Sequence, residues 1–285
     1  MGNYYCLVAG LPDLLPDDQK LQRSLLEFKT ELEENLRASD LKLISIFFQK
    51  FDNENLLKLL GNPEAILNPL GTLNQSDLLD IIQLFKDSDT PNDARIPSHF
   101  YQFLPAFLEN KPLFQGISWE DQLTSLYFKA ATNSTNTFIS KWFEFNLNVV
   151  NVLTALNCRK FNFNIEEAVI GNNEVAKTLR TSHSKDFGLV PIFPEISDLI
   201  RIADEDNLLE RERKIDLLRW QWLEEQSVFN YFDLERLFVY LLRVEMLERW
   251  TALDKQSGEQ VFRQMIAGIQ DSFEFPAEFE IKTVK

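Results

Sequence analysis

Three short segments of the sequence pair an acid or an amide with a second polar residue three positions later. Carboxylate and amide oxygens can bind a cation, and they are also the side chains that accept hydrogen bonds from free N–H groups where a helix begins. Aromatic residues precede each pair, and an apolar helical run follows it. The pairs are Asp52/Asn55, Asn148/Asn151 and Asp233/Arg236, and the basic residues that follow them are Lys58, Arg159, Lys160 and Arg243.

Ordinary helix capping explains each pair taken alone, because Asp and Asn are preferred caps and a preceding aromatic residue can pack on the next turn. Three copies about ninety residues apart favour a repeated helical unit, since tandem solenoids have shorter periods of about 20–50 residues. We therefore interpret the six paired residues as structural marks that fix helix starts. No catalytic, cofactor-binding or metal-binding residue is predicted.

Other residues with catalytic potential lack the companions that their chemistry needs. His99 and His183 are the only histidines, and neither belongs to an HExxH motif or a triad pattern. The acidic cluster Asp204, Glu205 and Asp206 could hold Mg²⁺, but it matches no Asp-rich DDxxD motif, and acids also favour helix starts. The two acids of DLLD (77–80) could likewise either hold a metal ion or favour a helix start. A magnesium-dependent helical enzyme or a helical scaffold thus remains the alternative hypothesis.

The overall charge argues against nucleic acid as a partner. The formal net charge is 29 − 44 = −15, which repels phosphate unless cations are concentrated locally. The most basic segment, LLERERKIDLLRW (208–220), alternates its cations with acids that include Asp216, as is typical of a solvated helix face. Cys6 and Cys158 are too few for a disulfide framework, so two reduced thiols are expected. A single disulfide between them is the alternative.

Helical periodicity dominates the sequence and predicts an all-α fold. Helix starts are expected at Ser76, Ser118, Asn164 and Ser257, and two or three long helices are expected between Glu195 and Ser257, a stretch without glycine or proline. YYCLVAG (4–10) could form a short N-terminal strand, and the FEFPAEFEI tail (273–281) could dock in extended form. We expect one helical domain with three pseudo-repeats, at about 1–95, 96–180 and 181–285.

FDNENLLKLL is similar to the repeat signature of the C-subunit family of V-type ATP synthases, whose eukaryotic counterpart is the d-subunit. In that family each of three helical repeats carries an acid, an Asn, an apolar helix and a basic residue. Asp52, Asn55, Leu56 and Leu57 stand in the matching places. NLNVVNVL and FDLERLFVYLLR look like degenerate copies, in which Asn148 replaces the acid and Arg236 replaces the Asn.

The whole chain resembles more closely an uncharacterised bacterial family encoded among V-type ATPase genes, through YYCLVAGLPDL, TALNCRKFNFNI, VIGNNEVAKTLRTS and KDFGL. The resemblance implies a non-catalytic, funnel-shaped central-stalk adaptor that couples the rotor shaft to the membrane rotor ring. Its partners would be the central-stalk subunits and the ring. Arg159, Lys160 and Arg243 would pair with carboxylates inside the fold or on a partner.

The expected location is the cytoplasm, with contact to the inner membrane only through the complex. The N-terminal apolar run is broken by Gly10, Pro12 and Asp13 and has no basic region before it, so neither a signal peptide nor a membrane span is predicted.

Overall fold

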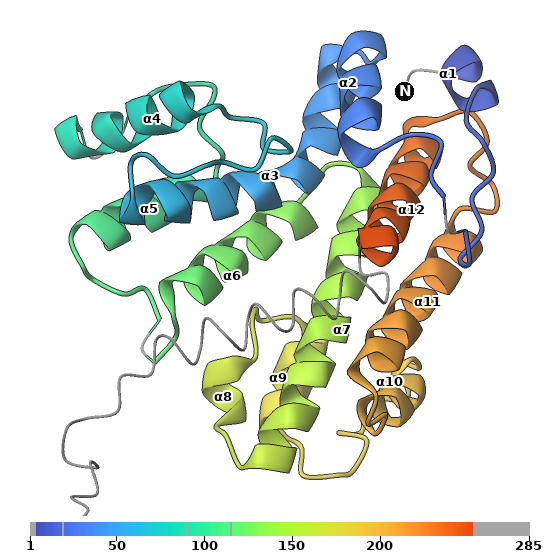
Figure 1. Ribbon diagram of the computed structural model, residues 1–285. Coiled ribbons are helices and arrows are strands. Elements are labelled where there is room, and N and C mark those ends of the chain that lie inside the picture. The colour runs from blue at the N-terminus through green and yellow to red at the C-terminus, as the bar shows by residue number, and fades with distance from the viewer. Residues whose placement is uncertain (1–3, 19, 89–90, 115, 253–285) are drawn as a thin grey trace, which may run out of the picture.

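The computed structural model describes residues 4–18, 20–88, 91–114 and 116–252 (Figure 1). These residues form helices and no strand, which confirms the predicted all-α fold. The helices are α1 (Tyr5–Ala9), α2 (Leu25–Asn35), α3 (Ala38–Gly61), α4 (Gln75–Asp87), α5 (Phe100–Leu108), α6 (Trp119–Thr132), α7 (Thr137–Phe161), α8 (Ile165–Ala168), α9 (Glu174–Thr181), α10 (Ile196–Ala203), α11 (Leu208–Gln226) and α12 (Leu234–Ala252).

The predicted N-terminal strand is wrong, because Tyr5–Ala9 forms the short helix α1. The N–H of Val8 bonds to the carbonyl of Tyr4 at 2.9 Å, which closes a helical turn. The N–H of Tyr4 does reach across the chain, to the carbonyl of Phe232 at 2.7 Å. A single bond of this kind cannot replace the ladder that makes a strand.

Side-chain caps start many of these helices, as the sequence predicts. Ser118 accepts a hydrogen bond from the N–H of Asp121, and Asn164 accepts one from the N–H of Glu166. The predicted start at Ser76 is wrong by two residues, because Asn74 is the cap and forms a capping box with Asp77. The start predicted at Ser257 and the 273–281 tail lie outside the described residues.

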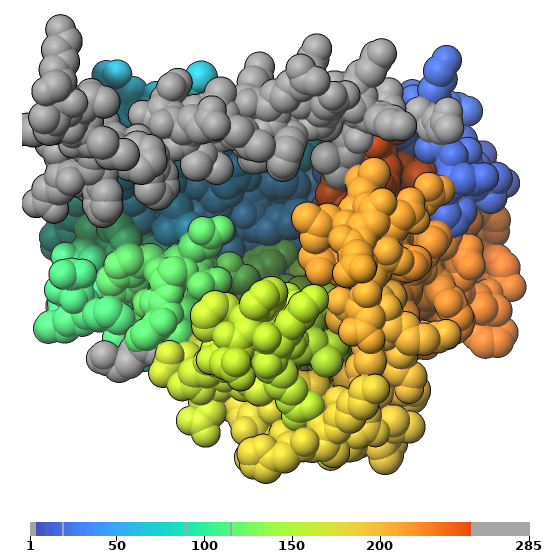
Figure 2. All heavy atoms as spheres, turned by 60° about the horizontal axis from the view of Figure 1, so that its bottom comes forward, coloured from blue at the N-terminus to red at the C-terminus, as the bar shows by residue number. Residues whose placement is uncertain are grey.

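Two hydrophobic cores organise the described helices. The smaller core joins the C-terminal half of α3 to α4, α5 and α6, which lie together on one side in Figure 1. The larger core gathers the rest around α7, which runs through the centre of the view toward α8, α9 and α10. In Figure 2 the green residues lie at the left of this face, and the yellow residues project at its bottom. Helices α3 and α7 therefore each serve as the spine of one group of helices.

Candidate functional site

Asp52 and Asn55 lie side by side on α3 and hold the loop that leads to α4. Nδ2 of Asn55 donates to the carbonyl of Asn68 at 2.9 Å, and Oδ1 accepts the N–H of the same residue at 2.7 Å. Oδ1 of Asp52 accepts the N–H groups of Thr72 and Leu73 at 2.7 and 3.0 Å, and Oδ2 accepts the Thr72 hydroxyl at 2.6 Å. We call this arrangement the first loop clamp.

The same arrangement recurs on α7, where Asn148 and Asn151 hold the loop that leads to α9. Nδ2 of Asn151 donates to the carbonyl of Ile170 at 2.7 Å, and Oδ1 accepts its N–H at 2.9 Å. Oδ1 of Asn148 accepts from Nδ2 of Asn173, the N-cap of α9. This second loop clamp repeats the reciprocal amide–backbone pairing of the first, with an amide in place of the carboxylate of Asp52.

These positions correct the expectation that the first two pairs mark helix starts. Asp52 and Asn55 lie inside α3, which begins at Ala38, and Asn148 and Asn151 lie inside α7, which begins at Thr137. All four side chains are buried. A buried amide needs a hydrogen-bond partner for its NH₂ group and another for its oxygen. Because the backbone groups of the helix already bond to one another, a neighbouring loop supplies these two partners.

The third pair is an ordinary cap. Oδ1 of Asp233 accepts the N–H of Arg236 at 3.0 Å, directly before α12, and Oδ2 accepts from Nδ2 of Asn230 at 2.7 Å. Here the predicted role as a helix start is confirmed. The side chain of Arg236 makes no hydrogen bond or ion pair with any residue that the structure describes, so this pair clamps no loop.

Burial raises the pKa of Asp52 above its ordinary value, and the hydrogen bonds from Thr72 and Leu73 oppose that rise. Nearby, Nζ of Lys29 donates to the carbonyl of Gly71 at 2.6 Å and brings a cation close to the clamp. The first clamp is thus a buried acid whose hydrogen-bond donors all come from the loop that leads to α4.

Gly71 allows the loop to approach this closely. A Cβ atom at Gly71 would lie 2.7 Å from Nδ2 of Asn55 and 2.8 Å from Oδ1 of Asp52. Both distances are shorter than the non-bonded contacts that real Cβ atoms make. We expect Gly71→Ala to lower the free energy of unfolding by about 1–3 kcal/mol, the usual cost of overpacking. The measurement is urea denaturation followed by circular dichroism.

Gly61→Ala is the matched control, because a Cβ there meets nothing within 4 Å. In a helix the exchange removes backbone freedom from the unfolded chain and should change stability by less than about 1 kcal/mol, in the stabilising direction. If Gly71→Ala and Gly61→Ala changed the free energy of unfolding equally, the close approach of the loop to the clamp would not be the cause of the destabilisation.

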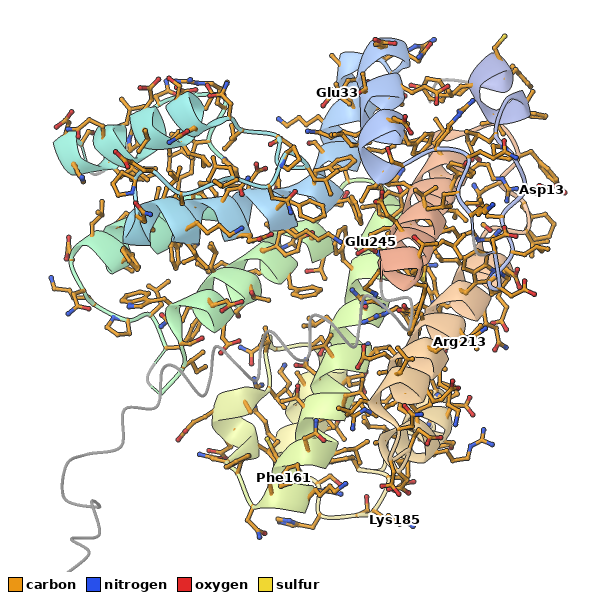
Figure 3. The ribbon with its side chains drawn as sticks, in the orientation of Figure 1. Asp13, Glu33, Phe161, Lys185, Arg213 and Glu245 are labelled. Carbon is orange, nitrogen blue, oxygen red and sulfur yellow. The ribbon has the colours of Figure 1, made fainter. Side chains whose placement is uncertain are left out.

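The basic residues predicted to contact partners differ in their surroundings. Arg159 donates to the carbonyls of Ser182 and Ser184 at 2.8 and 2.6 Å and lies over the Phe187 ring, so it holds a loop of its own fold. Lys160 is exposed beside Phe161, at the end of α7 that Figure 3 labels. Arg243 lies over the Trp220 ring and contacts Glu224.

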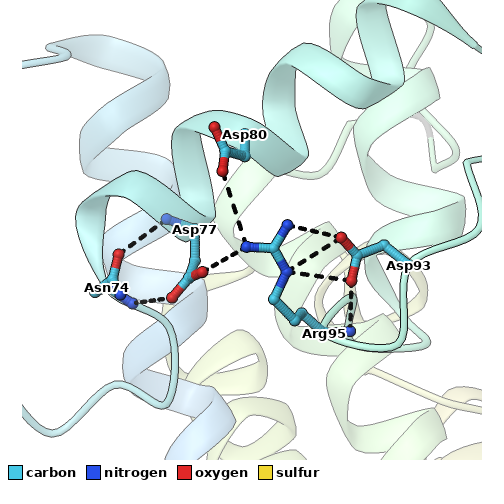
Figure 4. Close-up of polar contacts among 5 residues, drawn as sticks. All are labelled: Asn74, Asp77, Asp80, Asp93 and Arg95. Atoms are coloured by element: carbon cyan, nitrogen blue, oxygen red, sulfur yellow. Dashed lines mark hydrogen bonds and ion pairs between the residues drawn. The ribbon is translucent and has the colours of Figure 1, made fainter.

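The acids considered as metal ligands pair with cations. Arg95 binds Asp77, Asp80 and Asp93, with its shortest contacts at 2.6 Å to Asp77 and 2.7 Å to Asp93 (Figure 4). The hydrogen bond from Arg95 lowers the pKa of Asp93.

In the second acidic cluster, Glu205 pairs with Lys214, while Asp204 and Asp206 are exposed. Within the described ranges no group of three or more His, Cys, Asp or Glu side chains could hold a metal ion. Cys6 is exposed and Cys158 is buried, and both are free thiols.

Asp216 departs from the solvated face predicted for its segment, because it is buried against α12. It accepts from Arg219 at 3.0 Å, from Nε1 of Trp250 at 3.0 Å and from Arg249. A second ion pair, Lys50–Glu245 at 2.9 Å, joins α3 to α12 in a groove of about 440 Å³ between α3, α6, α7 and α12, where Figure 3 labels Glu245. Burial favours a high pKa for Glu245, but Lys50, Arg249 and Arg219 outweigh it and lower the pKa.

His99 is buried as a neutral side chain, and burial lowers its pKa from 6.5 to about 4. Its Nε2 lies 2.7 Å from Oδ1 of Asn53, which makes the Nε2–H tautomer the donor. Its Nδ1 has no hydrogen-bond partner in the described structure, so a second proton there would be a buried, unpaired charge.

Protonation of His99 should therefore make stability depend on pH. Because the folded pKa lies below the ordinary value, the stabilisation is complete above pH 6.5 and is lost as the pH falls toward 4. The free energy of unfolding should drop by about 3 kcal/mol across this range through this group. Urea denaturation at several pH values measures the loss. It should be absent in His99→Gln and retained in His183→Gln, an exposed control; an identical slope in both variants would contradict the assignment.

The described structure is thus an all-α protein in which two long helices each clamp the loop that follows them. The chain belongs to the DUF2764 family: the family model, described as a protein of unknown function, matches residues 1–273. This confirms the predicted membership of a family of unknown function over nearly the whole chain. No curated protein and no solved structure matches the chain, and the family match carries no link to the C-subunit family of V-type ATPases. None of the described helices is long and apolar enough to span a membrane.

Proposed function

We propose that this chain is a non-catalytic adaptor of a V-type ATPase, which joins central-stalk subunits to the membrane rotor ring. The observation that supports an adaptor is the placement of exposed aromatic side chains at two ends of the described structure. Phe161 and Phe163, at the end of α7, are 58% and 68% exposed. Phe229 and Tyr231, in the α11–α12 loop, are 87% and 63% exposed.

These two ends are far apart in the fold. Figure 3 labels Phe161 at the foot of α7, whereas the α11–α12 loop lies at the opposite end in Figure 1, beside α1. Aromatic residues are enriched where proteins bind one another, since they bury much area at a small entropic cost. A protein that bridges two partners needs two such contact surfaces.

The choice of a rotary ATPase rests on the sequence resemblance to its C-subunit family. FDNENLLKLL carries that resemblance, and its Asp52 and Asn55 form the first loop clamp. The recurrence of the clamp on α7 supports a repeated helical architecture, which that family also has. In this proposal the clamps are structural, and they fix the loops between the helices that carry the two aromatic ends.

Affinity purification of the full chain from its own host tests the proposal, after gentle detergent extraction of the membranes. We expect central-stalk and ring subunits to co-purify. Phe161→Ser with Phe163→Ser should weaken one contact, and Phe229→Ser with Tyr231→Ser the other. Ile66→Ser, at a residue that is 92% exposed in the loop before α4, is the matched control. An intact ATPase that elutes without this chain would overturn the proposal.

A further inference from the structure

A pocket of about 410 Å³ lies between the C-terminal end of α11, the α11–α12 loop and α12. Its described lining contains two guanidinium groups, of Arg236 and Arg243, and one carboxylate, of Glu224. These charges sum to +1, in a chain whose net charge is −15. Burial lowers the pKa of Arg243, and the carboxylates of Glu224 and of Asp13, which lies outside the lining, oppose that effect. The lining itself thus carries an excess of positive charge on an acidic protein.

Arg243 lines this pocket and is held in place from one side. Its guanidinium carbon lies 4.5 Å from the centre of the Trp220 ring, and its Nη2 lies 3.3 Å from Oε1 of Glu224. That same oxygen also accepts from Nε1 of Trp220 at 3.0 Å, so the Glu224 carboxylate is shared. Nε of Arg243 is buried and has no hydrogen-bond partner among the described residues. A buried donor without a partner is rare and costly.

Arg236 adds a second cation on the same face of α12. It precedes Arg243 by seven residues, which is two helical turns or about 10 Å along the axis. No described carboxylate pairs with its side chain. The nearby acid Asp233 is occupied, since its oxygens accept from the N–H of Arg236 and from Asn230. Arg236 is therefore free to bind a carboxylate from another molecule.

Aromatic and apolar side chains surround the two arginines. Val228, Tyr231 and Phe232 line the pocket, and Phe229 next to them is the most exposed aromatic residue of this loop. A guanidinium binds a carboxylate through two parallel hydrogen bonds, and an aromatic rim excludes water from such a pair. The pocket thus combines recognition of an acid with recognition of an apolar neighbour.

We propose that this pocket binds a partner segment in which a glutamate or aspartate adjoins an aromatic residue. The acid would pair with Arg236 and Arg243, and the aromatic side chain would pack on Phe229 and Tyr231. The inference rests on the proposed function in one respect, because it takes the segment to belong to the partner that the adaptor binds at its α11–α12 end.

The test uses the isolated full-length chain and two synthetic peptides. One carries Glu-Phe-Glu between glycine–serine flanks, and the other carries Gln-Phe-Gln in the same flanks. Isothermal titration calorimetry should show that the acidic peptide binds at least about tenfold more tightly, because only it can form the charged pairs. Added salt should reduce this difference.

Charge-reversal variants locate the binding. Arg236→Glu should lower affinity for the acidic peptide about tenfold and should gain affinity for a Lys-Phe-Lys peptide. Arg201→Glu makes the same charge change at an exposed site on α10 and should leave binding unchanged. Arg236→Gln, which removes the charge without reversing it, should give an intermediate loss. Circular dichroism checks that each variant is folded.

Equal binding of the two peptides, or equal effects of Arg236→Glu and Arg201→Glu, would overturn the pocket assignment. These results would leave co-purification with the ATPase untouched, so failure of the pocket is separable from failure of the adaptor. Acidic-peptide binding by a chain that never co-purifies with the ATPase would support the pocket and refute the adaptor.

Discussion

Asp216→Ala is expected to lower the free energy of unfolding by about 3–5 kcal/mol, the usual cost of removing one partner from a buried ion pair. Asp216 is only 4% exposed, and it is the acceptor shared by Arg219, Arg249 and the indole N–H of Trp250. Its removal takes away the only carboxylate that the described structure shows hydrogen-bonded to Arg219 and Arg249, and it leaves Glu245 as a more distant counter-charge. Burial opposes the charge of Arg249, but Asp216 outweighs it and raises the pKa of Arg249.

Urea denaturation at neutral pH measures this effect, with Asp198→Ala as the matched control. Asp198 also pairs with an arginine three residues later, but both side chains are exposed, so the loss there should stay below about 1 kcal/mol. Arg249→Met should cost less than Asp216→Ala, because Arg219 and Trp250 still satisfy the carboxylate. A loss at Asp216 no larger than at Asp198 would mean that the buried cluster does not join α11 to α12.

Asn55→Ala is expected to cost about 2–3 kcal/mol, which exceeds the cost of losing a typical cap. The substitution removes both hydrogen bonds to Asn68 and leaves a cavity at a fully buried position. It also leaves the backbone N–H and carbonyl of Asn68 without their partner. Asn151→Ala should cost a similar amount, because it breaks the same pair of bonds at Ile170.

Asn207→Ala separates clamping from capping. Asn207 accepts from the N–H groups of Leu209 and Glu210 at an exposed helix start, so its loss should cost only about 0.5–2 kcal/mol. Hydrogen exchange should show faster exchange at Asn68 in Asn55→Ala, and unchanged exchange there in Asn207→Ala. Equal stabilities for the Asn55 and Asn207 variants, with no change at Asn68, would contradict the clamp.

The helical class is predictable because apolar periodicity and capping residues are local properties of the sequence. Ser118 and Asn164 illustrate this, since each caps a helix through a residue two or three positions later. The spacing of Asp52/Asn55 and Asn148/Asn151 marks them as a repeated feature, but it predicts the wrong role for them. Their partners lie 13 to 25 residues further on, and no local pattern distinguishes a buried polar residue within a helix from one that begins it.

Long-range partners also explain the wrong prediction at Asp216. The segment around it alternates charges as a solvated helix does, and only the packing of α12 against α11 brings Arg249 and Trp250 onto it. The pocket at Arg236 and Arg243 depends on tertiary structure in the same way, because Trp220 and Glu224 come from the preceding helix. The sequence singles out Arg243 because it follows the third pair. Only the fold shows that it packs against Trp220 and Glu224.

The reciprocal bonds of Asn55 and Asn151 make each side-chain amide a substitute for a peptide group. One amide fixes one loop residue, so the chain between the two is free to vary in length. Asn68 is the 13th residue after Asn55, whereas Ile170 is the 19th after Asn151. Loop closure costs little more when a loop grows. The exposed stretch around Glu64 and Ile66 is therefore a natural insertion point for a fluorescent reporter or an epitope, which would leave both anchors of the loop intact.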